Sequence, residues 1–244
     1  MTTPIIGILA GMGPRSTAPF VDLVVTECQR QYGATDDADF PPMLIASWPT
    51  PFYLDRPLDH AAIQSAITAG LTRLASSGVA FVALPCNTAH IYYPQLASSI
   101  AIPLLNMIDL AVQAIPPTAR RIALLATRPT LAAGLYQTAL AAAGRECIVD
   151  EAIQEQVDQL LRGIKTSAAL HTLAAAWHDL VRDLARSGAD TALIACTDLN
   201  VVSATEQAEI ALLDATHCLA RSVVQHWLAI IATERETGNV RRET

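Results

Sequence analysis

Short apolar runs alternate with longer amphipathic segments along most of this chain, and this alternation limits the possible folds more than any other feature. The apolar runs have the length of buried strands, and the amphipathic segments have the length of helices. The predicted strands are residues 5–9, 43–46, 81–84, 103–106, 121–126, 147–149, 192–195 and 210–213. The predicted helices lie near residues 16–32, 59–77, 130–143, 151–163, 168–187 and 215–233. Apolar strands separated by helices are typical of parallel sheets covered on both faces, so we predict an α/β fold.

The two halves of the chain repeat three elements in the same order. Residues 6–17 resemble 122–130, residues 82–88 resemble 193–198, and residues 102–108 resemble 210–216. In the second pair, each apolar strand is followed by a cysteine. The simplest explanation is two similar parallel-sheet α/β domains related by pseudo-twofold symmetry, with the active site in the interdomain cleft. The alternative is a chance similarity, which any α/β protein can show.

This repeat predicts where the domains begin and end. We expect an N-terminal α/β domain over residues 1–113 and a C-terminal α/β domain over residues 114–214. The helix at 215–233 is expected to pack back on the first domain. Residues 234–244 are charged and show no period, so we expect a flexible tail there.

Composition and charge exclude several classes of protein. Hydrophobic residues make up 52% of the 244 residues and charged residues 16%, which is typical of a globular chain with a large core. The net charge of −7 argues against nucleic-acid and anionic-membrane partners. No run reaches the roughly 18 apolar residues of a membrane span, and the N-terminus lacks the basic region of a signal peptide. We therefore expect a soluble, cytoplasmic protein.

The five cysteines are too scattered for a structural role in pairs or in a metal site. They are Cys28, Cys86, Cys147, Cys196 and Cys218. An odd number without a secretory signal argues against a disulfide framework. The absence of any CxxC pair leaves a structural zinc site unsupported, so no metal is expected.

Cys86 and Cys196 differ from the other three because each follows an apolar strand, in "LPCNT" and "IACTD". Ligands of parallel α/β sheets bind beyond the carboxyl ends of the strands. Backbone N–H groups near such an end lower the pKa of a thiol and make it usable as a base. Two such thiols suit a reaction in which one base removes a proton and an acid on the other side supplies one. The alternative for these two residues is an unreactive, buried cysteine. We interpret the other three cysteines in that way.

Two loops and one histidine are further candidates. The first loop, "GILAGMGPRST", has Ser16 where a dinucleotide fingerprint has its third glycine, so we interpret it as a turn that offers N–H groups to an anion. Its counterpart in the second half carries Thr127 and Thr130. His90, four residues after Cys86, is expected to support the thiol through hydrogen bonds rather than to take part in catalysis.

Two cations could bind a carboxylate. Arg56 lies on a loop after the second strand, where an arginine is either solvated or placed to grip a carboxylate with two hydrogen bonds. Lys165 is the only lysine beside fifteen arginines. Either this lysine is there by chance, or the site needs a compact point charge that arginine could not supply.

Six motifs together resemble the aspartate/glutamate racemase family, the cofactor-independent amino-acid racemases. They are "GMGPRST" (11–17), "LDR" (54–56), "PCNTAH" (85–90), "LLATRPTLAAGLY" (124–136), "GIK" (163–165) and "ACTDL" (195–199). The resemblance implies a homodimer of two-domain chains that acts on a small dicarboxylic amino acid, aspartate first and glutamate second, without a cofactor.

The same resemblance implies a role for each matching residue. Cys86 and Cys196 would be the acid/base thiols. The expected substrate-binding residues are Met12, Arg56, Asn87, Thr88, Thr127, Lys165 and Thr197. Among these, Asn87, Thr88 and Thr197 would hold the α-carboxylate and α-amino groups. Arg56 and Lys165 would grip the side-chain carboxylate, and Met12 would line the pocket.

The chain also departs from the family pattern at four places. Ala195 stands where the family usually has glycine, and Asp198 stands where glutamate is usual. Leu219 occupies the position of a frequent histidine, with His217 nearby but out of register. Arg15 adds a positive charge inside the first turn. The surroundings of the second cysteine are therefore expected to differ from the usual ones.

Several other functions remain open. A maleate cis–trans isomerase or a hydantoin racemase shares the scaffold, although hydantoins lack the extra carboxylate that Arg56 and Lys165 would bind. Arylmalonate decarboxylases typically keep one cysteine, which argues against them. A pyridoxal enzyme with Lys165 as Schiff base lacks a clear cofactor phosphate site. A non-catalytic protein that binds a small acid would not need both thiols.

Overall fold

The computed structural model describes residues 3–53, 56–203 and 210–240. Contacts divide the chain into two compact units. Unit 1 comprises Met1–Pro85, Tyr92–Leu105 and Leu219–Thr244, and unit 2 comprises Cys86–Ile91 and Asn106–Cys218. Each unit holds a parallel sheet with helices, which confirms the predicted α/β class. The predicted domain limits stay a prediction.

Unit 1 is built on a three-stranded parallel sheet of order β2-β1-β3. Its strands are β1 (Ile6–Ala10), β2 (Met43–Ser47) and β3 (Phe81–Ala83). The central strand β1 is buried along its whole length, as its apolar sequence predicts. The predicted strand at 103–106 is reduced to a single bridge between Val82 and Leu104. The reason is that Asn106 already caps the next helix, which leaves too few residues for a ladder.

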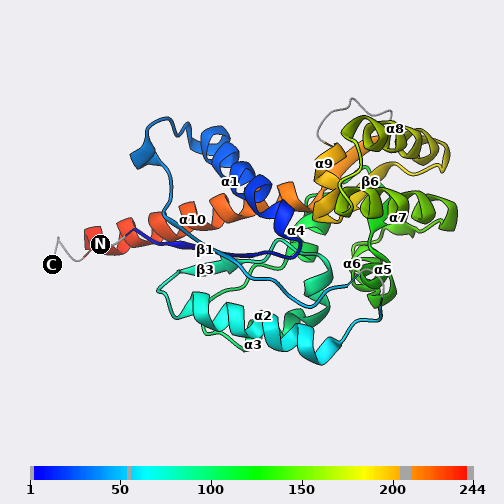
Figure 1. Ribbon diagram of the computed structural model, residues 1–244. Coiled ribbons are helices and arrows are strands. Elements are labelled where there is room, and N and C mark those ends of the chain that lie inside the picture. Colours follow the sequence, from blue (N-terminus) through cyan, green and yellow to red (C-terminus); the bar gives the residue numbers. More distant parts are fainter. Residues whose placement is uncertain (1–2, 54–55, 204–209, 241–244) are drawn as a thin grey trace. The chain divides into compact units, whose positions relative to one another are not determined.

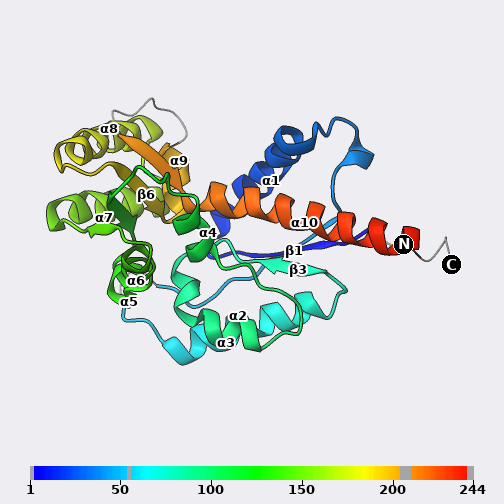
Figure 2. The ribbon, with the colours of Figure 1, turned by 180° about the vertical axis from the view of Figure 1, so that it is seen from behind.

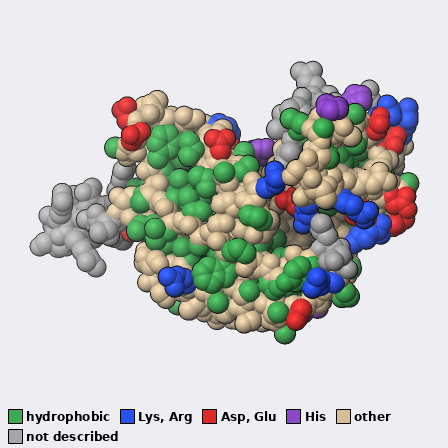
Figure 3. Space-filling model, viewed as in Figure 1, with side chains coloured by type: hydrophobic (Ala, Val, Ile, Leu, Met, Phe, Trp, Pro, Cys, Tyr) green, Lys and Arg blue, Asp and Glu red, His purple; other side chains and the backbone are tan. Residues whose placement is uncertain are grey.

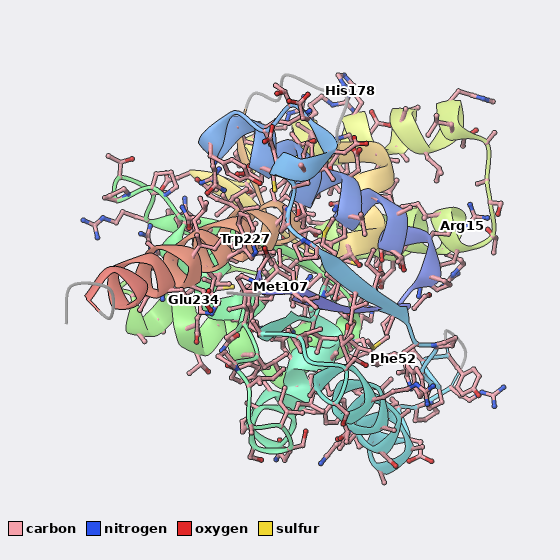
Figure 4. The ribbon with its side chains drawn as sticks, turned by 90° about the vertical axis from the view of Figure 1, so that its left-hand side faces the viewer. Arg15, Phe52, Met107, His178, Trp227 and Glu234 are labelled. Atoms are coloured by element: carbon pink, nitrogen blue, oxygen red, sulfur yellow. The ribbon has the colours of Figure 1, made fainter. Side chains whose placement is uncertain are left out.

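Four helices complete unit 1 together with short 3-10 turns. They are α1 (Thr17–Tyr32), α2 (His60–Ala75), α3 (Tyr93–Ser98) and most of α10 (Ala215–Val240), with η1 (Pro14–Ser16) and η2 (Asp37–Asp39). Helices α2 and α3 lie on one side of β1 and β3, and α10 lies on the other side (Figures 1 and 2). Trp227 of α10, labelled in Figure 4, is buried, and its indole N–H donates to the carbonyl of Pro4 at 2.9 Å.

Unit 2 is built on a four-stranded parallel sheet of order β5-β4-β6-β7. Its strands are β4 (Arg121–Ala126), β5 (Glu146–Ile148), β6 (Thr191–Ala195) and β7 (Ala211–Asp214). Its helices are α4 (Met107–Gln113), α5 (Arg128–Ala133), α6 (Leu135–Ala142), α7 (Glu151–Lys165), α8 (Leu170–Arg186) and α9 (Asn200–Ser203), with η4 (Thr197–Leu199). The turn η3 (Thr88–Tyr92) begins in this unit. This strand order repeats that of unit 1: in each unit, the first strand in sequence lies between the second and the third.

Helices α7 and α8 lie side by side in both views (Figures 1 and 2) and carry much of the core of unit 2. Both have one apolar face, and the residues on that face are buried against the sheet and against each other. The largest of them, Trp177, is only 1% exposed. This burial is what the amphipathic pattern of the two segments predicts.

Several segments differ in detail from the sequence prediction. The predicted helix at 130–143 is divided into α5 and α6 at Gly134, whose φ of 68° suits glycine and ends the first helix. In the predicted tail at 234–244, helix α10 continues as far as Val240, residues 241–244 lie outside the described residues, and flexibility of the tail stays a prediction. Helices α3 and α4 are too short to give a clear period, and they were not predicted.

The edge strand β2 departs from the expectation that helices cover every strand. Leu44 and Ile45 are 38% and 44% exposed, although they are neighbours that point to opposite faces of the sheet. Hydrophobic side chains gather on the face of unit 1 seen in Figure 3. Within the described residues, no helix is both long and apolar enough to cross a membrane.

Gly11 and Gly33 provide a matched test of the turn after β1. Both have positive φ, 98° and 75°. A Cβ at Gly11 would lie 2.5 Å from the backbone nitrogen of Trp48, whereas a Cβ at Gly33 would meet open space. We expect Gly33→Ala to lower the free energy of unfolding by about 1–2 kcal/mol, the cost of the left-handed conformation. Gly11→Ala should cost about 1–3 kcal/mol more, because the backbone must also move. Denaturant unfolding measures both, and equal costs would contradict the close approach.

Candidate active site

The sheet of unit 2 brings two predicted site residues to neighbouring strand ends. Strands β4 and β6 pair in parallel, with Ala126 opposite Ala195. The next residue of each strand is Thr127 and Cys196 respectively. These two residues therefore lie at the carboxyl edge of the sheet, where parallel α/β sheets bind their ligands.

The segment Cys86–Ile91 packs with unit 2, although it follows β3 of unit 1. The Thr88 hydroxyl lies 3.1 Å from the hydroxyl of Thr127 and 2.9 Å from that of Thr130. Thr127 and Thr130 are themselves 2.9 Å apart. In a closed ring of this kind each hydroxyl donates once and accepts once. Thr127 Oγ1 also accepts the backbone N–H of Thr130 at 3.4 Å, so a lone pair remains for a further donor on Thr88 and on Thr130.

His90 holds the backbone at Cys86 in position. Its Nε2 accepts a hydrogen bond at 3.0 Å from the backbone N–H of Met107, the first residue of α4; Met107 is labelled in Figure 4. Its Nδ1 therefore carries the proton and donates to the carbonyl of Cys86 at 2.8 Å. The ring is 1% exposed. These bonds connect the cysteine loop to a helix of the same unit.

Both thiols are buried and face backbone N–H groups. Cys86 and Cys196 are each 7% exposed. The N–H groups of Ala89 and Thr88 donate to the sulfur of Cys86, and the N–H of Asp198 donates to that of Cys196. Burial raises the pKa of Cys86 to about 11 and that of Cys196 to about 12, against the lowering effect of these donors. The two sulfurs also interact electrostatically, since Cys86 raises the pKa of Cys196.

An ion pair lies beside the thiols. The Lys165 Nζ is 3.7 Å from Oδ2 of Asp198. The negative charge of Asp198 raises the pKa of both cysteines, and the positive charge of Lys165 lowers it. Lys165 thus lies within electrostatic reach of both thiols and has a carboxylate of the protein as its partner.

Tyr136 is a polar residue of this site to which the sequence assigned no role. Its hydroxyl donates to Oδ1 of Asn87 at 2.5 Å, and both residues are buried. Burial, together with the charges of Cys218 and Asp214, holds the pKa of Tyr136 well above its usual value, so the phenol stays protonated. Among the described residues, Asn87 Nδ2 is buried without a hydrogen-bond partner. The signal was present in the motif "LLATRPTLAAGLY", which ends on this tyrosine.

The remaining predicted residues divide between the two units. Thr197 is buried in η4 of unit 2, next to Cys196. Met12 and Arg56 belong to unit 1. Met12 is buried after β1, and the guanidinium of the exposed Arg56 lies 4.2 Å from the centre of the Tyr53 ring.

The departures from the family pattern can also be placed. Ala195 is fully buried at the end of β6, and Leu219 is fully buried in α10. His217 lies 3.6 Å from Asp214, whose pKa is raised by burial and lowered in turn by that histidine. Among the described residues there is no group of three or more His, Cys, Asp or Glu side chains arranged to hold a metal ion.

Comparison with known proteins gives a family for this chain. Residues 9–223 match the family described as Asp/Glu/Hydantoin racemase. The chain belongs to this family. The broad specificity amino-acid racemase RacX of Bacillus subtilis (strain 168) is 43% identical over 224 residues, which make up 92% of this chain and 98% of that protein.

Solved structures agree on the fold. The Picrophilus torridus aspartate racemase has a TM-score of 0.74 at 23% identity, over 92% of this chain and 94% of that one. A glutamate racemase from Francisella tularensis in complex with D-glutamate has a TM-score of 0.61 at 12% identity, over 93% and 81% of the two chains. The predicted family and the predicted enzyme class, a racemase, are confirmed at the level of the family.

Removal of the Tyr136 hydroxyl tests the buried hydrogen bond to Asn87. Tyr136→Phe should lower the free energy of unfolding by about 1–3 kcal/mol, because Oδ1 of Asn87 is left buried without a donor. Tyr92→Phe is the matched control, since it removes a hydrogen bond of 2.9 Å to the exposed His60, which water can replace. That variant should lose about 1 kcal/mol or less. Denaturant unfolding compares the two, and equal losses would contradict a desolvated bond at Tyr136.

Proposed function

We propose that this chain racemises free amino acids by a two-thiol mechanism, with Cys86 and Cys196 as the acid/base pair. The observation that carries the proposal is the presence of two buried thiols in one unit, each with a backbone N–H donor, with Cys86 close enough to raise the pKa of Cys196. An inert buried cysteine does not need such donors. Membership of a racemase family supports the same reaction.

The proton balance of this reaction is simple. One cysteine, as thiolate, takes the α-proton and becomes a thiol, and the electron pair of the C–H bond stays on the substrate as a carbanion. The other cysteine, as thiol, donates its proton to the opposite face of the same carbon and becomes the thiolate. The product has the opposite configuration, and the two cysteines have exchanged roles. The reverse reaction starts from that state, so neither enantiomer requires a different machinery.

The carbanion needs strong stabilisation, because an α-proton is very weakly acidic. We assign this role to donors around the α-carboxylate. Asn87 is the first candidate, because its Nδ2 is a buried donor without a hydrogen-bond partner among the described residues. Tyr136 would fix the orientation of that amide by occupying its Oδ1. The ring of threonine hydroxyls has lone pairs that suit the α-ammonium group.

The raised pKa values have a use and a cost. A thiolate whose conjugate acid has a pKa near 11 is a stronger base than an ordinary thiolate, which helps it to remove a weakly acidic proton. The cost is that little thiolate exists at neutral pH. The α-ammonium of a bound substrate would offset this cost, because a cation close to the sulfur favours its ionised form.

The substrate has two candidates. An acidic amino acid, aspartate first and glutamate second, follows from the resemblance and from the expected grip of Arg56 and Lys165 on a side-chain carboxylate. A wider range of amino acids is favoured by two observations. The 43% identical relative is named a broad specificity racemase, and Lys165 already has Asp198 as its partner.

Other expectations remain as proposals of the same kind. The family description includes hydantoin racemases. Hydantoin racemisation and maleate isomerisation are therefore tested as alternative reactions in the proton-exchange experiment. We also expect a cytoplasmic homodimer, as the family resemblance implies. The exposed apolar residues Leu44 and Ile45 of the edge strand β2 support a contact between unit 1 and a second copy of the chain.

The reaction can be measured by proton exchange. The protein is incubated in D₂O with each enantiomer of aspartate, glutamate, alanine and lysine, and maleate and a hydantoin are included. Loss of the α-proton signal by NMR, together with the opposite enantiomer on chiral chromatography, is the expected result for amino acids. Cys86→Ala and Cys196→Ala should each lower racemisation by about 10²–10⁴-fold, the usual contribution of an acid/base group.

The matched control for both variants is Cys147→Ala. Cys147 lies on the edge strand β5, is half-buried, and is a free thiol like the other two. This control should keep full activity. Full activity in folded Cys86→Ala and Cys196→Ala proteins would refute the two-thiol mechanism, and turnover of maleate or a hydantoin alone would replace the amino-acid substrate.

The pH dependence follows from the direction of the pKa shifts. Both thiol pKa values are raised, so the fraction of thiolate in the free enzyme increases with pH throughout the neutral range. We expect kcat/KM, which reports the free enzyme, to rise about tenfold per pH unit between roughly pH 6.5 and 8.5. Initial rates at low substrate concentration measure this slope. A flat profile over that range would mean that the essential thiol is already ionised.

A further inference from the structure

Gln154 is a buried polar side chain to which the proposed chemistry gives no role. It lies near the start of α7 and is only 2% exposed. A buried amide costs free energy unless its polar atoms are paired, so its contacts indicate what it does. The other buried residues of this helix are apolar, namely Ile153, Val157, Leu160, Leu161 and Ile164.

Both N–H bonds of the Gln154 amide are used. Its Nε2 donates to the carbonyl of Ala126 at 3.0 Å and to Oδ1 of Asp158 at 2.8 Å. Ala126 is the last residue of β4. Strand β5 pairs with β4 only as far as Ala123, so among the described residues the end of β4 has one strand neighbour, β6. Gln154 thus supports the end of this strand from the helix.

The second contact of Gln154 continues to the other side of Thr127. Asp158 accepts from Gln154 with Oδ1, and its Oδ2 accepts from the Nε of Arg128 at 2.5 Å. Ala126 and Arg128 are the two neighbours of Thr127 in the chain. Helix α7 therefore holds the backbone before Thr127 through Gln154 and the side chain after it through Asp158.

The ion pair in this network depends on the buried amide. The side chain of Asp158 is 25% exposed and that of Arg128 is 49% exposed. Ion pairs that water reaches to this extent contribute little by themselves, because both side chains can move apart. A hydrogen bond from an amide that is shielded from water is stronger and holds the carboxylate in one orientation. Gln154 is therefore the fixed member of the network.

Thr127 in turn sets the geometry of the threonine hydroxyls. Its Oγ1 lies 3.1 Å from that of Thr88 and 2.9 Å from that of Thr130. It also accepts the backbone N–H of Thr130 as the N-cap of α5. The lone pairs that remain for a substrate lie on Thr88 and Thr130, and their directions depend on the position of Thr127. A displacement of about 1 Å in such a group can cost about a hundredfold in rate.

We propose that Gln154 is a positioning residue of this enzyme, which holds the turn at Thr127 so that the ring of threonine hydroxyls meets the α-ammonium group of the substrate. Gln154 acts through the carbonyl of Ala126 and through Asp158, and it does not contact the substrate. This inference rests on the proposed two-thiol racemase and extends its machinery to a buried residue of α7.

The test compares Gln154→Met with Gln156→Met. The first variant keeps the length of the side chain and removes both N–H donors. The second removes a glutamine from the same helix, where it donates to Asp183 of α8 at 2.9 Å. With the best amino-acid substrate of the proton-exchange experiment, Gln154→Met should lower kcat/KM at least about tenfold, and Gln156→Met less than about twofold. Equal losses in the two folded variants would show a general effect of α7 and overturn the inference.

A double variant separates positioning from general damage to the fold. Thr127→Val removes the hydroxyl through which Gln154 is proposed to act. Added to Thr127→Val, Gln154→Met should lower kcat/KM less than about threefold, because residues that act through one shared group are not additive. The same loss in both backgrounds would overturn the inference.

The substrate without its α-amino group gives a second readout. The matching acids are succinate for aspartate, glutarate for glutamate, propionate for alanine and ε-aminocaproate for lysine, each measured as a competitive inhibitor. Gln154→Met should raise the KM of the amino acid at least about tenfold and change the Ki of the acid less than about threefold, because the hydroxyls meet only the ammonium group. Equal weakening of both ligands would overturn the inference.

A second variant keeps the inference testable should Gln154→Met fail to fold. Asp158→Asn leaves an acceptor for Gln154 but turns an N–H donor toward Arg128, so the turn loses half of its support. This variant should lower kcat/KM about three- to tenfold, again through KM. An unchanged kcat/KM in folded Asp158→Asn protein would overturn the inference.

The outcomes separate this inference from the proposed function. Racemisation by the unaltered protein, with full activity in folded Gln154→Met protein, would overturn the inference and leave the two-thiol reaction standing. Absence of racemisation with every amino acid in the unaltered protein would overturn the proposed function, and this inference with it.

Discussion

Parallel pairing between β4 and β6 is the constraint on which the rest of the site depends. The register places Ala126 opposite Ala195, so Thr127 and Cys196 leave the sheet at the same edge. A slip by one residue would turn the side chains of one strand to the other face and separate these two positions. The strand interiors are fully apolar and buried, and this makes such a slip costly. The chemistry of the site is thus positioned by hydrophobic packing that lies behind it.

The second constraint is the burial of two titratable thiols. Desolvation favours the neutral thiol, whereas backbone N–H donors favour the thiolate, and burial prevails at both cysteines in the free protein. Charges near the sulfurs shift this balance further. Asp198 and Lys165 already shift it in opposite directions, and a bound α-ammonium would shift it further. The reactivity of the two thiols therefore depends on charged groups around them as well as on their burial.

The cysteine loop, Cys86–Ile91, lies between segments of unit 1 in the sequence but is grouped with unit 2. Cys86 follows β3 of unit 1, yet Thr88 contacts Thr127 and Thr130, and His90 binds the start of α4. A sequence repeat suggests that each domain carries its own cysteine. The structure groups both cysteines in unit 2, because polar side chains in the loop find their partners there.

The sequence by itself determined the α/β class, most strands and helices, the family, and the strand-end positions of both cysteines, because these depend on local periodicity and on short motifs. It could not show that the strand at 103–106 would be reduced to a bridge, or that β2 would expose Leu44 and Ile45, because both depend on which strands become neighbours. The sequence also could not show the partners of Asn87 and Lys165, which lie 49 and 33 residues away in the chain. Only the tertiary structure decided that Tyr136 binds Asn87 and that Asp198 neutralises the only lysine. Pairing of polar side chains over such separations depends on how the elements pack, and no local pattern encodes it.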